Sequence, residues 1–257
     1  MVNLSHYNPS VKAAVIIVAV LCLAFFFDPV TPAIVFVGTV VLTFVWGKVP
    51  LKPWLLMMSP FLFIAVGYVW TTIVFAKPSD GPVLWQMGSF AVTLDAVLRG
   101  CALSIRVLAV ASLSLLFAFT TDATKLLLSL MQQCRLSPKL AYGIMAGYRF
   151  LPLFKDEWKT LQNARRVRGM GASKRGISSL FTAFQDAIPL LASAVRRAEQ
   201  TAMAMESKGF TGGARTFYHE VNVTMKDSWF AGAIVLLFVL AIAISMWTGM
   251  FTLFGDL

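Results

Sequence analysis

Two cationic residues, each followed directly by glycine, are the groups of this chain best suited to bind a partner through charge. Arg168 precedes Gly169 at the end of the run ARRVRG, and Lys208 precedes Gly209 in the run MESKGF. Glycine commonly ends a helix, so each pattern predicts a helix whose last turn presents a positive side chain. An arginine that meets a partner carboxylate forms charge-assisted, often bidentate hydrogen bonds worth about 1.5–3 kcal/mol each. Both tips are therefore candidate docking points.

A purely structural explanation also exists for these two cations. A positive charge in the last turn of a helix is favoured by the helix dipole by about 0.3–1 kcal/mol. Their occurrence as a pair in one polar segment, in a chain without a nucleotide-binding motif, favours docking. The only Gly-Lys pair, Gly47-Lys48, lacks the Ser or Thr that follows in a P-loop, so ATP is expected to bind to another subunit.

No other group of residues predicts covalent chemistry. The three cysteines are scattered and form no CxxC pair, and neither histidine has metal-ligand spacing around it. Serine and threonine occur mainly inside apolar runs, where packing explains them, and no nucleophile has a nearby histidine base. The sequence predicts a protein that is not an enzyme and that holds neither a cofactor nor a metal ion of its own.

The composition places the chain in a lipid bilayer. Of its 257 residues 58% are hydrophobic and only 13% are charged, with a mean hydropathy of +0.75. The net charge of +10 arises mainly from residues 120–228, which carry most of the 22 Lys and Arg. Because apolar runs flank this basic segment, it indicates a cytoplasmic region beside the membrane and not a nucleic-acid groove.

A helix needs roughly 20 apolar residues, with a range of about 17 to 25, to cross the hydrocarbon, and five apolar runs meet this requirement. They are Val11–Phe27, Val30–Trp46, Trp54–Ala76, approximately Cys101–Phe119, and Trp229–Phe251. Four tryptophans lie near their ends, as interfacial anchors do: Trp46, Trp54, Trp229 and Trp247. The connection at residues 77–95, with Pro78, Gly81 and Pro82, is expected to be a loop.

The distribution of positive charge predicts the orientation in the membrane. Lys48 and Lys52 lie between the second and third runs, and the basic segment lies between the fourth and fifth. Positive loops stay inside, which places the N-terminus and residues 120–228 in the cytoplasm and the C-terminus outside. We therefore divide the chain into transmembrane helices at 1–119, a cytoplasmic segment at 120–228 and a last transmembrane helix at 229–257.

The cytoplasmic segment is expected to form three amphipathic helices, which completes an all-α polytopic fold. They are a first helix capped by Thr121 or Asp122, a second from Ser137-Pro138 to Arg168, and a third from near Ile177 to Lys208. In the third helix Ala194, Ala198 and Ala202 leave a strip with little bulk. A close crossing with the second helix near Ala164 would fit this strip, although alanine is also simply a good helix former.

Two arginines enter the fourth apolar run on one face, because Arg99 and Arg106 are seven residues apart. Arg99 fits a side chain that extends to the outer interface. Arg106 lies about 10 Å deeper along the helix, where it would contact either a membrane partner or an internal carboxylate such as Asp95.

Several segments of the chain match a known family. They are YRFLP at 148–152, VRG at 167–169, IPLL at 188–191, RRAE at 196–199 and AMESKGF at 204–210. On these segments the chain resembles the transmembrane, or T, component of energy-coupling-factor transporters, the EcfT/CbiQ family, over most of its length. In that family two Ala-Arg-Gly signatures end two long coupling helices, and each arginine docks into a groove on one of two cytoplasmic ATPase subunits.

The resemblance assigns the signatures to two triplets of this chain. These are Val167, Arg168 and Gly169, and Ser207, Lys208 and Gly209. Lys208 stands where the family has arginine, so it keeps the charge and loses the planar fork. The second contact is therefore expected to demand less geometric precision, or to meet a groove matched to lysine.

The resemblance also implies the function. The chain would be the scaffold of an importer in the bacterial inner membrane, coupling two ABC-type ATPases, identical or different, which bind ATP and Mg, to a small substrate-binding membrane subunit. The cargo would be a vitamin, a vitamin precursor or a transition-metal ion. Flexible apolar side chains such as Met145, Leu191 and Met205 would form the platform for the small subunit.

Two other functions were compatible with parts of the sequence. Five spans with an intramembrane Arg106 could line the path of a stand-alone secondary transporter or channel. A membrane enzyme acting on lipids could use the basic segment to bind anionic head groups, but no catalytic group is present for it.

Overall fold

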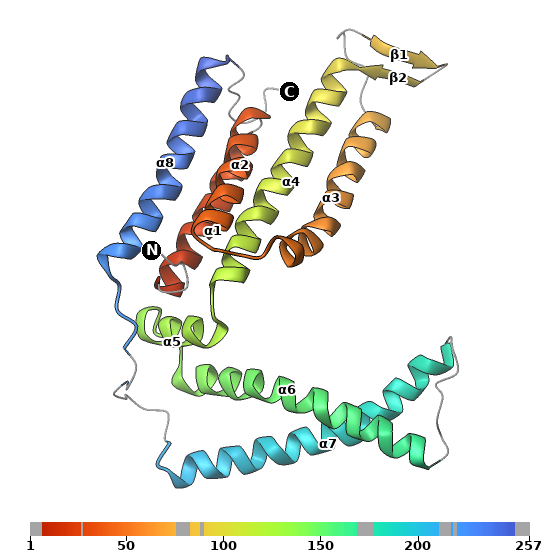
Figure 1. The fold of residues 1–257 in the computed structure, drawn as a ribbon, viewed down its shortest axis with the longest axis vertical. Helices are drawn as coiled ribbons and strands as arrows, with labels where there is room; N and C mark the ends of the chain where they lie inside the picture. The colour runs from red at the N-terminus through yellow and green to blue at the C-terminus, as the bar shows by residue number, and fades with distance from the viewer. Residues whose placement is uncertain are drawn as a thin grey trace. The chain divides into compact units, whose positions relative to one another are not determined.

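The computed structural model describes residues 7–26, 28–75, 83–87, 90–168, 177–210, 217 and 220–249. Within these residues the chain forms eight helices and one two-stranded hairpin (Figure 1). The helices are α1 Pro9–Phe25, α2 Val30–Val45, α3 Leu51–Val74, α4 Leu94–Thr120, α5 Ala123–Gln133, α6 Pro138–Val167, α7 Ile177–Ser207 and α8 Met225–Trp247. The strands are β1 Val83–Met87 and β2 Phe90–Thr93.

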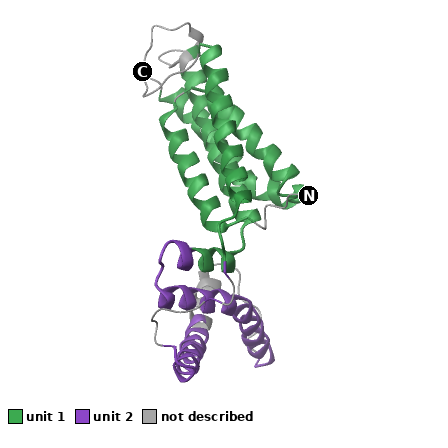
Figure 2. Ribbon diagram, turned by 90° about the vertical axis from the view of Figure 1, so that its left-hand side faces the viewer, with its two compact units in different colours: residues 1–129, 221–257 green, residues 130–220 purple. Residues whose placement is uncertain are grey.

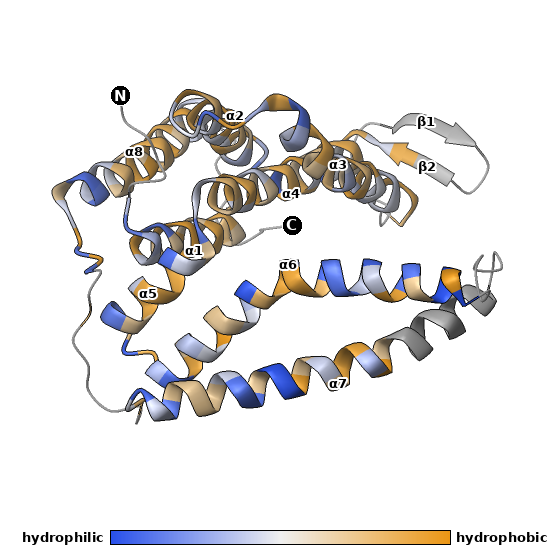
Figure 3. Ribbon diagram, turned by 60° about the horizontal axis from the view of Figure 1, so that its bottom comes forward, coloured by the Kyte–Doolittle hydropathy of each residue, from blue (hydrophilic) through white to orange (hydrophobic). Residues whose placement is uncertain are grey.

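The chain divides into two compact units, which Figure 2 shows in different colours. The first, here called the bundle unit, comprises residues 1–129 and 221–257 and contains α1 to α4 and α8. The second, the arm unit, comprises residues 130–220 and contains α6 and α7. Figure 3 shows the difference in surface chemistry, since hydrophobic residues dominate the bundle helices and hydrophilic ones recur along α6 and α7.

Three bundle helices are long and apolar enough to cross a membrane. They are α3, the Ala96–Thr120 part of α4, and α8, with 24, 25 and 23 residues. The first two predicted spans form apolar helices of 17 and 16 residues, α1 and α2, which are shorter than a bilayer crossing at 1.5 Å per residue. The prediction of five apolar helices in these places is thus confirmed, and a spanning length is confirmed for three of them.

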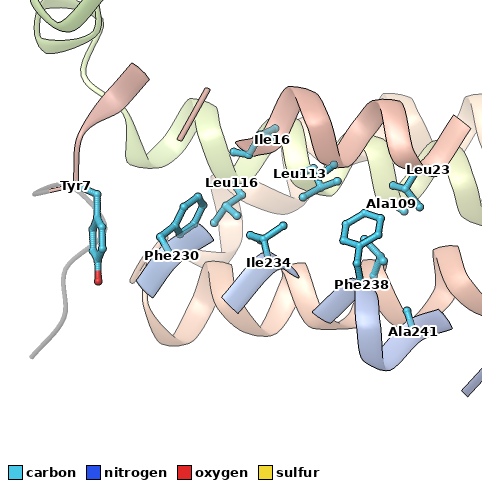
Figure 4. Close-up of a cluster of buried hydrophobic side chains, with 12 residues drawn as sticks. Tyr7, Ile16, Leu23, Ala109, Leu113, Leu116, Phe230, Ile234, Phe238 and Ala241 are labelled. Atoms are coloured by element: carbon cyan, nitrogen blue, oxygen red, sulfur yellow. The ribbon is translucent and has the colours of Figure 1, made fainter. Parts of the chain in front are cut away.

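The bundle is held together by an apolar core between α1, α2, α4 and α8. Aliphatic and aromatic side chains pack together there. Figure 4 shows Phe230, Ile234 and Phe238 of α8 beside Leu113 and Leu116 of α4. Hydrogen bonds add to the helix contacts, because Thr39 Oγ1 of α2 lies 2.5 Å from Ser112 Oγ of α4. Such interhelical bonds stabilise helix pairs where no water competes.

The tryptophans occupy two different environments. Trp229 and Trp247 are exposed at the two ends of α8, where 18 residues separate them by about 27 Å of helix, close to the hydrocarbon thickness. Trp54 was expected to be an interfacial anchor as well, but it is buried, with its ring edge-on to Phe44 at a centroid distance of 5.3 Å. Its apolar surroundings in the α3–α4 core outweigh the preference of indole for an interface.

The expected loop at residues 77–95 is a β-hairpin where the structure describes it, so the fold is not entirely helical. Val83 pairs with Thr93 and Met87 with Phe90 in an antiparallel ladder. These residues have high strand propensity, which the proline and glycine signals before them had obscured. Thr93 then caps α4, since its side-chain oxygen accepts a hydrogen bond from the Ala96 N–H at 3.4 Å. Helix α4 consequently begins earlier than residue 101 and includes Arg99.

The helices of the polar segment at residues 120–228 lie where the sequence predicts them. Asp122 caps α5 by accepting hydrogen bonds from the N–H groups of Thr124 and Lys125, at 2.8 and 3.0 Å. Helix α6 begins at Pro138, as expected, but the side chain of Ser137 makes no capping hydrogen bond. Helix α7 contains Pro189 and α6 contains Pro152, each well before the helix end that carries a cation.

Candidate functional site: two helix tips joined by a polar clamp

Helices α6 and α7 cross each other (Figure 1). Polar and aromatic side chains meet at this crossing. Arg197 of α7 forms an ion pair with Glu157 of α6, and Ser193 Oγ donates a hydrogen bond of 2.9 Å to the second oxygen of the same carboxylate. The Arg197 guanidinium also lies over the Phe150 ring, 5.9 Å from its centroid. We call these four residues, Phe150, Glu157, Ser193 and Arg197, the clamp.

The clamp replaces the alanine crossing that the sequence predicted. Ala164, Ala198 and Ala202 are exposed in the structure, and of that strip only Ala194, next to Ser193, is half-buried. Sequence reasoning missed Glu157 and Arg197 because 40 residues separate them and each looks like an ordinary surface charge. The prediction of a crossing is confirmed, whereas its predicted position was wrong.

A second contact fixes the direction in which the two helices run. The Phe210 ring, two residues beyond Lys208, meets the Tyr142 ring near the start of α6 edge-on, with centroids 5.6 Å apart. The end of α7 therefore lies along the first part of α6, on one side of the clamp. Arg168, at the end of α6, lies on the other side, so the crossing separates the two cationic tips.

The distances along both helices from the clamp to the tips are equal. Arg168 follows Glu157 by 11 residues and Lys208 follows Arg197 by 11 residues, which corresponds to about 17 Å of helix each and places the tips roughly 30 Å apart. Pro152 precedes Glu157, and Pro189 precedes both Ser193 and Arg197. The helix from clamp to tip is thus free of the residue that most often bends helices.

The end of α7 is closed by a defined C-cap. Gly209 has a φ of 76°, its N–H donates to the Glu206 carbonyl, and the Phe210 N–H donates to the Met205 carbonyl, both at 2.9 Å. These two bonds are those of a Schellman motif, which places Lys208 at the last, half-helical position. The predicted glycine end of this helix is confirmed, whereas Gly169, its counterpart after Arg168, lies outside the described residues.

This cap carries a prediction for stability. Gly209→Ala is expected to lower the stability of the purified full-length chain by about 1–2 kcal/mol, because a Cβ disfavours the left-handed conformation. Nothing lies within 4 Å of the added carbon, so the cost comes from the backbone alone. Thermal unfolding in detergent measures the effect, and Gly209→Asn should recover most of it.

The matched control for the cap is Gly143 within α6, where an added methyl group would also meet open space. Gly143→Ala is expected to be neutral or stabilising, because alanine is favoured over glycine in a helix interior. Equal losses for Gly143→Ala and Gly209→Ala would contradict the role assigned to the cap.

The side chains at both tips point away from the rest of the arm unit. Val167 is 89% exposed although it is apolar, and Arg168, Ser207 and Lys208 are exposed as well. The main chain at Arg168 is nonetheless ordered by a 3.2 Å hydrogen bond from its N–H to the Ala164 carbonyl. Each tip therefore presents a cation on a fixed helix end.

An apolar surface accompanies the tips. Exposed side chains at helical spacing line one face of α6, and others line α7: Leu140, Ile144, Tyr148, Leu151, Ile188, Leu191 and Val195. Part of α7 borders a shallow surface groove of about 500 Å³, lined among others by Leu191, Val195 and Arg196. Of the predicted platform residues Leu191 is 66% exposed, whereas Met145 and Met205 are half-buried.

Arg106 is engaged inside the bundle unit. Its guanidinium donates a hydrogen bond to the carbonyl of Phe26 and is attracted by the buried carboxylate of Asp28. Asp28 in turn accepts 2.7 Å hydrogen bonds from the Thr31 N–H and the Ser245 hydroxyl. The internal partner of Arg106 is therefore the α1–α2 connection. The side chain of Asp95, suggested as that partner, lies outside the described residues, and Arg99 is exposed, as expected.

No metal centre was found among the residues that the structure describes, where no three His, Cys, Asp or Glu side chains come together. The exposed side chains at the tips offer charge pairing and apolar contact, which are means of binding another protein.

The chain is similar to known proteins over most of its length. Residues 3–219 match the family CbiQ, described as cobalt transport protein. The chain is 30% identical over 205 residues to the energy-coupling factor transporter transmembrane protein EcfT of Exiguobacterium sibiricum, covering 76% of each chain. It is 27% identical over 232 residues to the protein of the same name from Streptococcus thermophilus, covering 86% of each. The chain therefore belongs to the EcfT/CbiQ family of transmembrane components of energy-coupling-factor transporters.

Proposed function

We propose that this chain transmits movement from two cytoplasmic ATPase subunits to a small substrate-binding membrane subunit. The observation that carries the proposal is the pair of exposed cationic tips, Arg168 and Lys208, at equal distances on opposite sides of the clamp. Tips roughly 30 Å apart are too distant to share one small docking site, so each fits a separate partner. ATP and Mg belong to those partners, and this chain catalyses no reaction.

The arm unit would bind the small membrane subunit through its exposed apolar face. Large apolar patches on a protein surface mark interaction sites, and Leu140, Ile144 and Leu191 are all at least half-exposed. Leu191 of the expected platform lies on this face. Met145 and Met205, which are half-buried, would contribute less contact area than we expected from the sequence.

The proposed topology has five membrane helices, with the N-terminus and the arm unit in the cytoplasm of the bacterial inner membrane. Helices α1 and α2 are short, but a short apolar helix is accommodated by local thinning of the bilayer at modest energetic cost. The cargo is a vitamin, a vitamin precursor or a transition-metal ion, which the small subunit and not this chain would select.

The structure offers less support for a stand-alone transporter or channel. That function needed Arg106 to face a path, and its guanidinium is instead occupied by the Phe26 carbonyl and the Asp28 carboxylate. Reconstituting the chain alone in proteoliposomes separates the two functions. We expect no uptake without the ATPases and the small subunit, whereas substrate uptake by the chain alone would refute the proposal.

The identity of the partners is directly measurable. A tagged copy of the chain, purified from native membranes in mild detergent, is expected to bring down ABC-type ATPase subunits and a small integral membrane protein, identified by mass spectrometry. The number of distinct ATPases recovered also decides whether Arg168 and Lys208 meet identical or different grooves. Recovery of the chain without any ATPase would contradict the proposed function.

Lys208→Arg tests whether the second groove accepts the arginine of the family signature. Arginine keeps the charge and adds a planar fork that pairs well with carboxylates, so ATPase co-purification should equal or exceed that of the unaltered chain. Lys208→Ala is the companion variant and is expected to weaken co-purification. A clear loss with Lys208→Arg would mean that the groove is shaped for an ammonium group.

A further inference from the structure

The segment that follows α4 and the segment that precedes α8 lie beside the same buried polar cluster of the bundle unit. On the way out the chain passes from α4 through the non-helical residues Thr121 and Asp122 into α5, within which the bundle unit ends at residue 129, and it re-enters the bundle unit through the non-helical residues 221–224. We call Asn8, Lys12, Thr120 and Asp227 the junction cluster, and all four are buried. Lys12 and Asp227 are each only 2% exposed, which is rare for charged side chains that lack a structural partner.

Lys12 holds the outgoing connection. Its ammonium group donates a 3.0 Å hydrogen bond to the carbonyl of Thr120, the last residue of α4. The final carbonyls of a helix have no partner within the helix and carry the negative end of its dipole. A cation reaching across from α1 therefore fixes the end of α4, from which the chain turns into α5 and continues to the arm unit.

Asp227 and Asn8 hold the returning connection. The two carboxylate oxygens of Asp227 accept 2.7 Å hydrogen bonds from the N–H groups of Asn8 and Thr224. The amide group of Asn8 donates to the carbonyl of Val221 at 3.5 Å. Most of these bonds end on main-chain atoms, so they position the backbone itself at both the start of α1 and the start of α8.

The two halves of the cluster are linked by charge. The Asp227 carboxylate attracts the Lys12 ammonium group, and both side chains are buried, so solvent screens the attraction weakly. Tyr7 closes the cluster on one side, where its ring packs on Phe230 with centroids 6.2 Å apart. Desolvation, followed by the negative charge of Asp227, raises the pKa of the Tyr7 phenol.

We infer that Lys12 and Asp227 are positioning residues that hold both connecting segments on the bundle. Movement of the arm unit is then transmitted to the bundle helices and is not lost in flexible connecting segments. This inference rests on the proposed function, because it concerns how the movement of the tips reaches the membrane. Flexible connections of a few residues would otherwise let the arm unit turn while the bundle stayed still.

The test measures, in the complete complex, how much the distance between the two units varies. Spin labels are placed on exposed positions of the two units, at Met246 of α8 and Gln200 of α7, in a background in which the three cysteines are replaced. Distances between the labels are measured by pulsed electron paramagnetic resonance, once without nucleotide and once with ATP plus vanadate. The variants are Lys12→Met, Asp227→Asn and the double variant. The matched control is Lys226→Met, which replaces an exposed lysine next to Asp227.

We expect the width of the distance distribution at least to double in the double variant, with a reduced shift on addition of nucleotide. Lys226→Met should leave both quantities unchanged. The double variant is decisive because it removes both charges together and leaves no buried charge uncompensated, so it is expected to assemble even where a single variant does not. An unchanged width and shift in the double variant would overturn the inference.

The same samples distinguish a failure of this inference from a failure of the proposed function. The junction variants leave both tips intact, so ATPase co-purification and ATP hydrolysis should stay within about twofold of the unaltered complex, whereas the coupling of hydrolysis to movement is lost. If the junction variants keep their coupling while Arg168→Glu loses its ATPase, the inference fails and the proposed function stands. If Arg168→Glu keeps its ATPase, the proposed function fails first.

Discussion

Arg168→Glu is expected to abolish ATP-driven uptake and to release an ATPase subunit from the purified complex. The exposed arginine would otherwise donate charge-assisted hydrogen bonds worth about 1.5–3 kcal/mol each to a partner carboxylate, and glutamate replaces that attraction by repulsion. Loss of two such bonds corresponds to binding weaker by roughly a hundredfold or more. Co-purification and uptake in reconstituted vesicles measure the two effects.

Arg166 provides the matched control for this substitution. It lies two residues earlier, in the last turn of α6, and is also exposed, whereas Arg168 is the C-cap residue. Two residues of helix turn a side chain by about 200°, so the two arginines point to different sides. Arg166→Glu makes the same change of charge and should leave most of the ATPase bound. If both variants lost the ATPase, general electrostatic attraction and not specific docking of Arg168 would explain the binding. If neither lost it, Arg168 would not be a docking residue.

Glu157→Arg is expected to uncouple the complex while both ATPases stay bound. The substitution breaks the ion pair with Arg197, removes the acceptor of the Ser193 hydroxyl and sets two cations against each other. Because the pair is half-exposed, its loss and the added repulsion together amount to about 1–2 kcal/mol, which would lower the population of the native crossing roughly tenfold. The ratio of uptake to ATP hydrolysis should fall accordingly.

Two further variants make this prediction specific to the clamp. The exchange Glu157→Arg with Arg197→Glu restores opposite charges and should recover at least half of the uptake, which a non-specific loss of stability would not. Asp156→Arg reverses the neighbouring, well-exposed carboxylate, which makes only a 3.9 Å contact with Lys159, and should have little effect. Failure of the exchange to restore uptake would refute a role for the ion pair itself.

The ends of the helices were predictable because they depend on local chemistry. A cation followed by glycine ended α7, Ser-Pro began α6, and Asp122 capped α5, and each of these signals lies within a few residues of its effect. The exposure of Arg168 and Lys208 followed from the same local patterns. The hairpin was missed because prolines and glycine before it masked the strand propensity of Val83–Met87.

The contacts between helices could not be read from the sequence in the same way. The strip around Ala198 satisfied the spacing of a close crossing, but Glu157 and Arg197 gain an ion pair by meeting, and this contact lies where the helices cross. For Arg106 the nearer carboxylate along the chain was Asp95, yet the structure brings Asp28 to it from a different helix connection. Periodicity shows which face is apolar, and it does not show which residue on another helix lies opposite.

The equal spacing of Arg168 and Lys208 from the clamp has a mechanical consequence. A rigid lever with arms of about 17 Å converts a rotation of about 10° at its pivot into a tip displacement of about 3 Å on either side. In the proposed function, equal arms would give neither ATPase the greater leverage, so that a movement imposed by one at its tip would be balanced by the same movement imposed by the other. Inserting or deleting a single helical turn on one side alone would make the two strokes unequal.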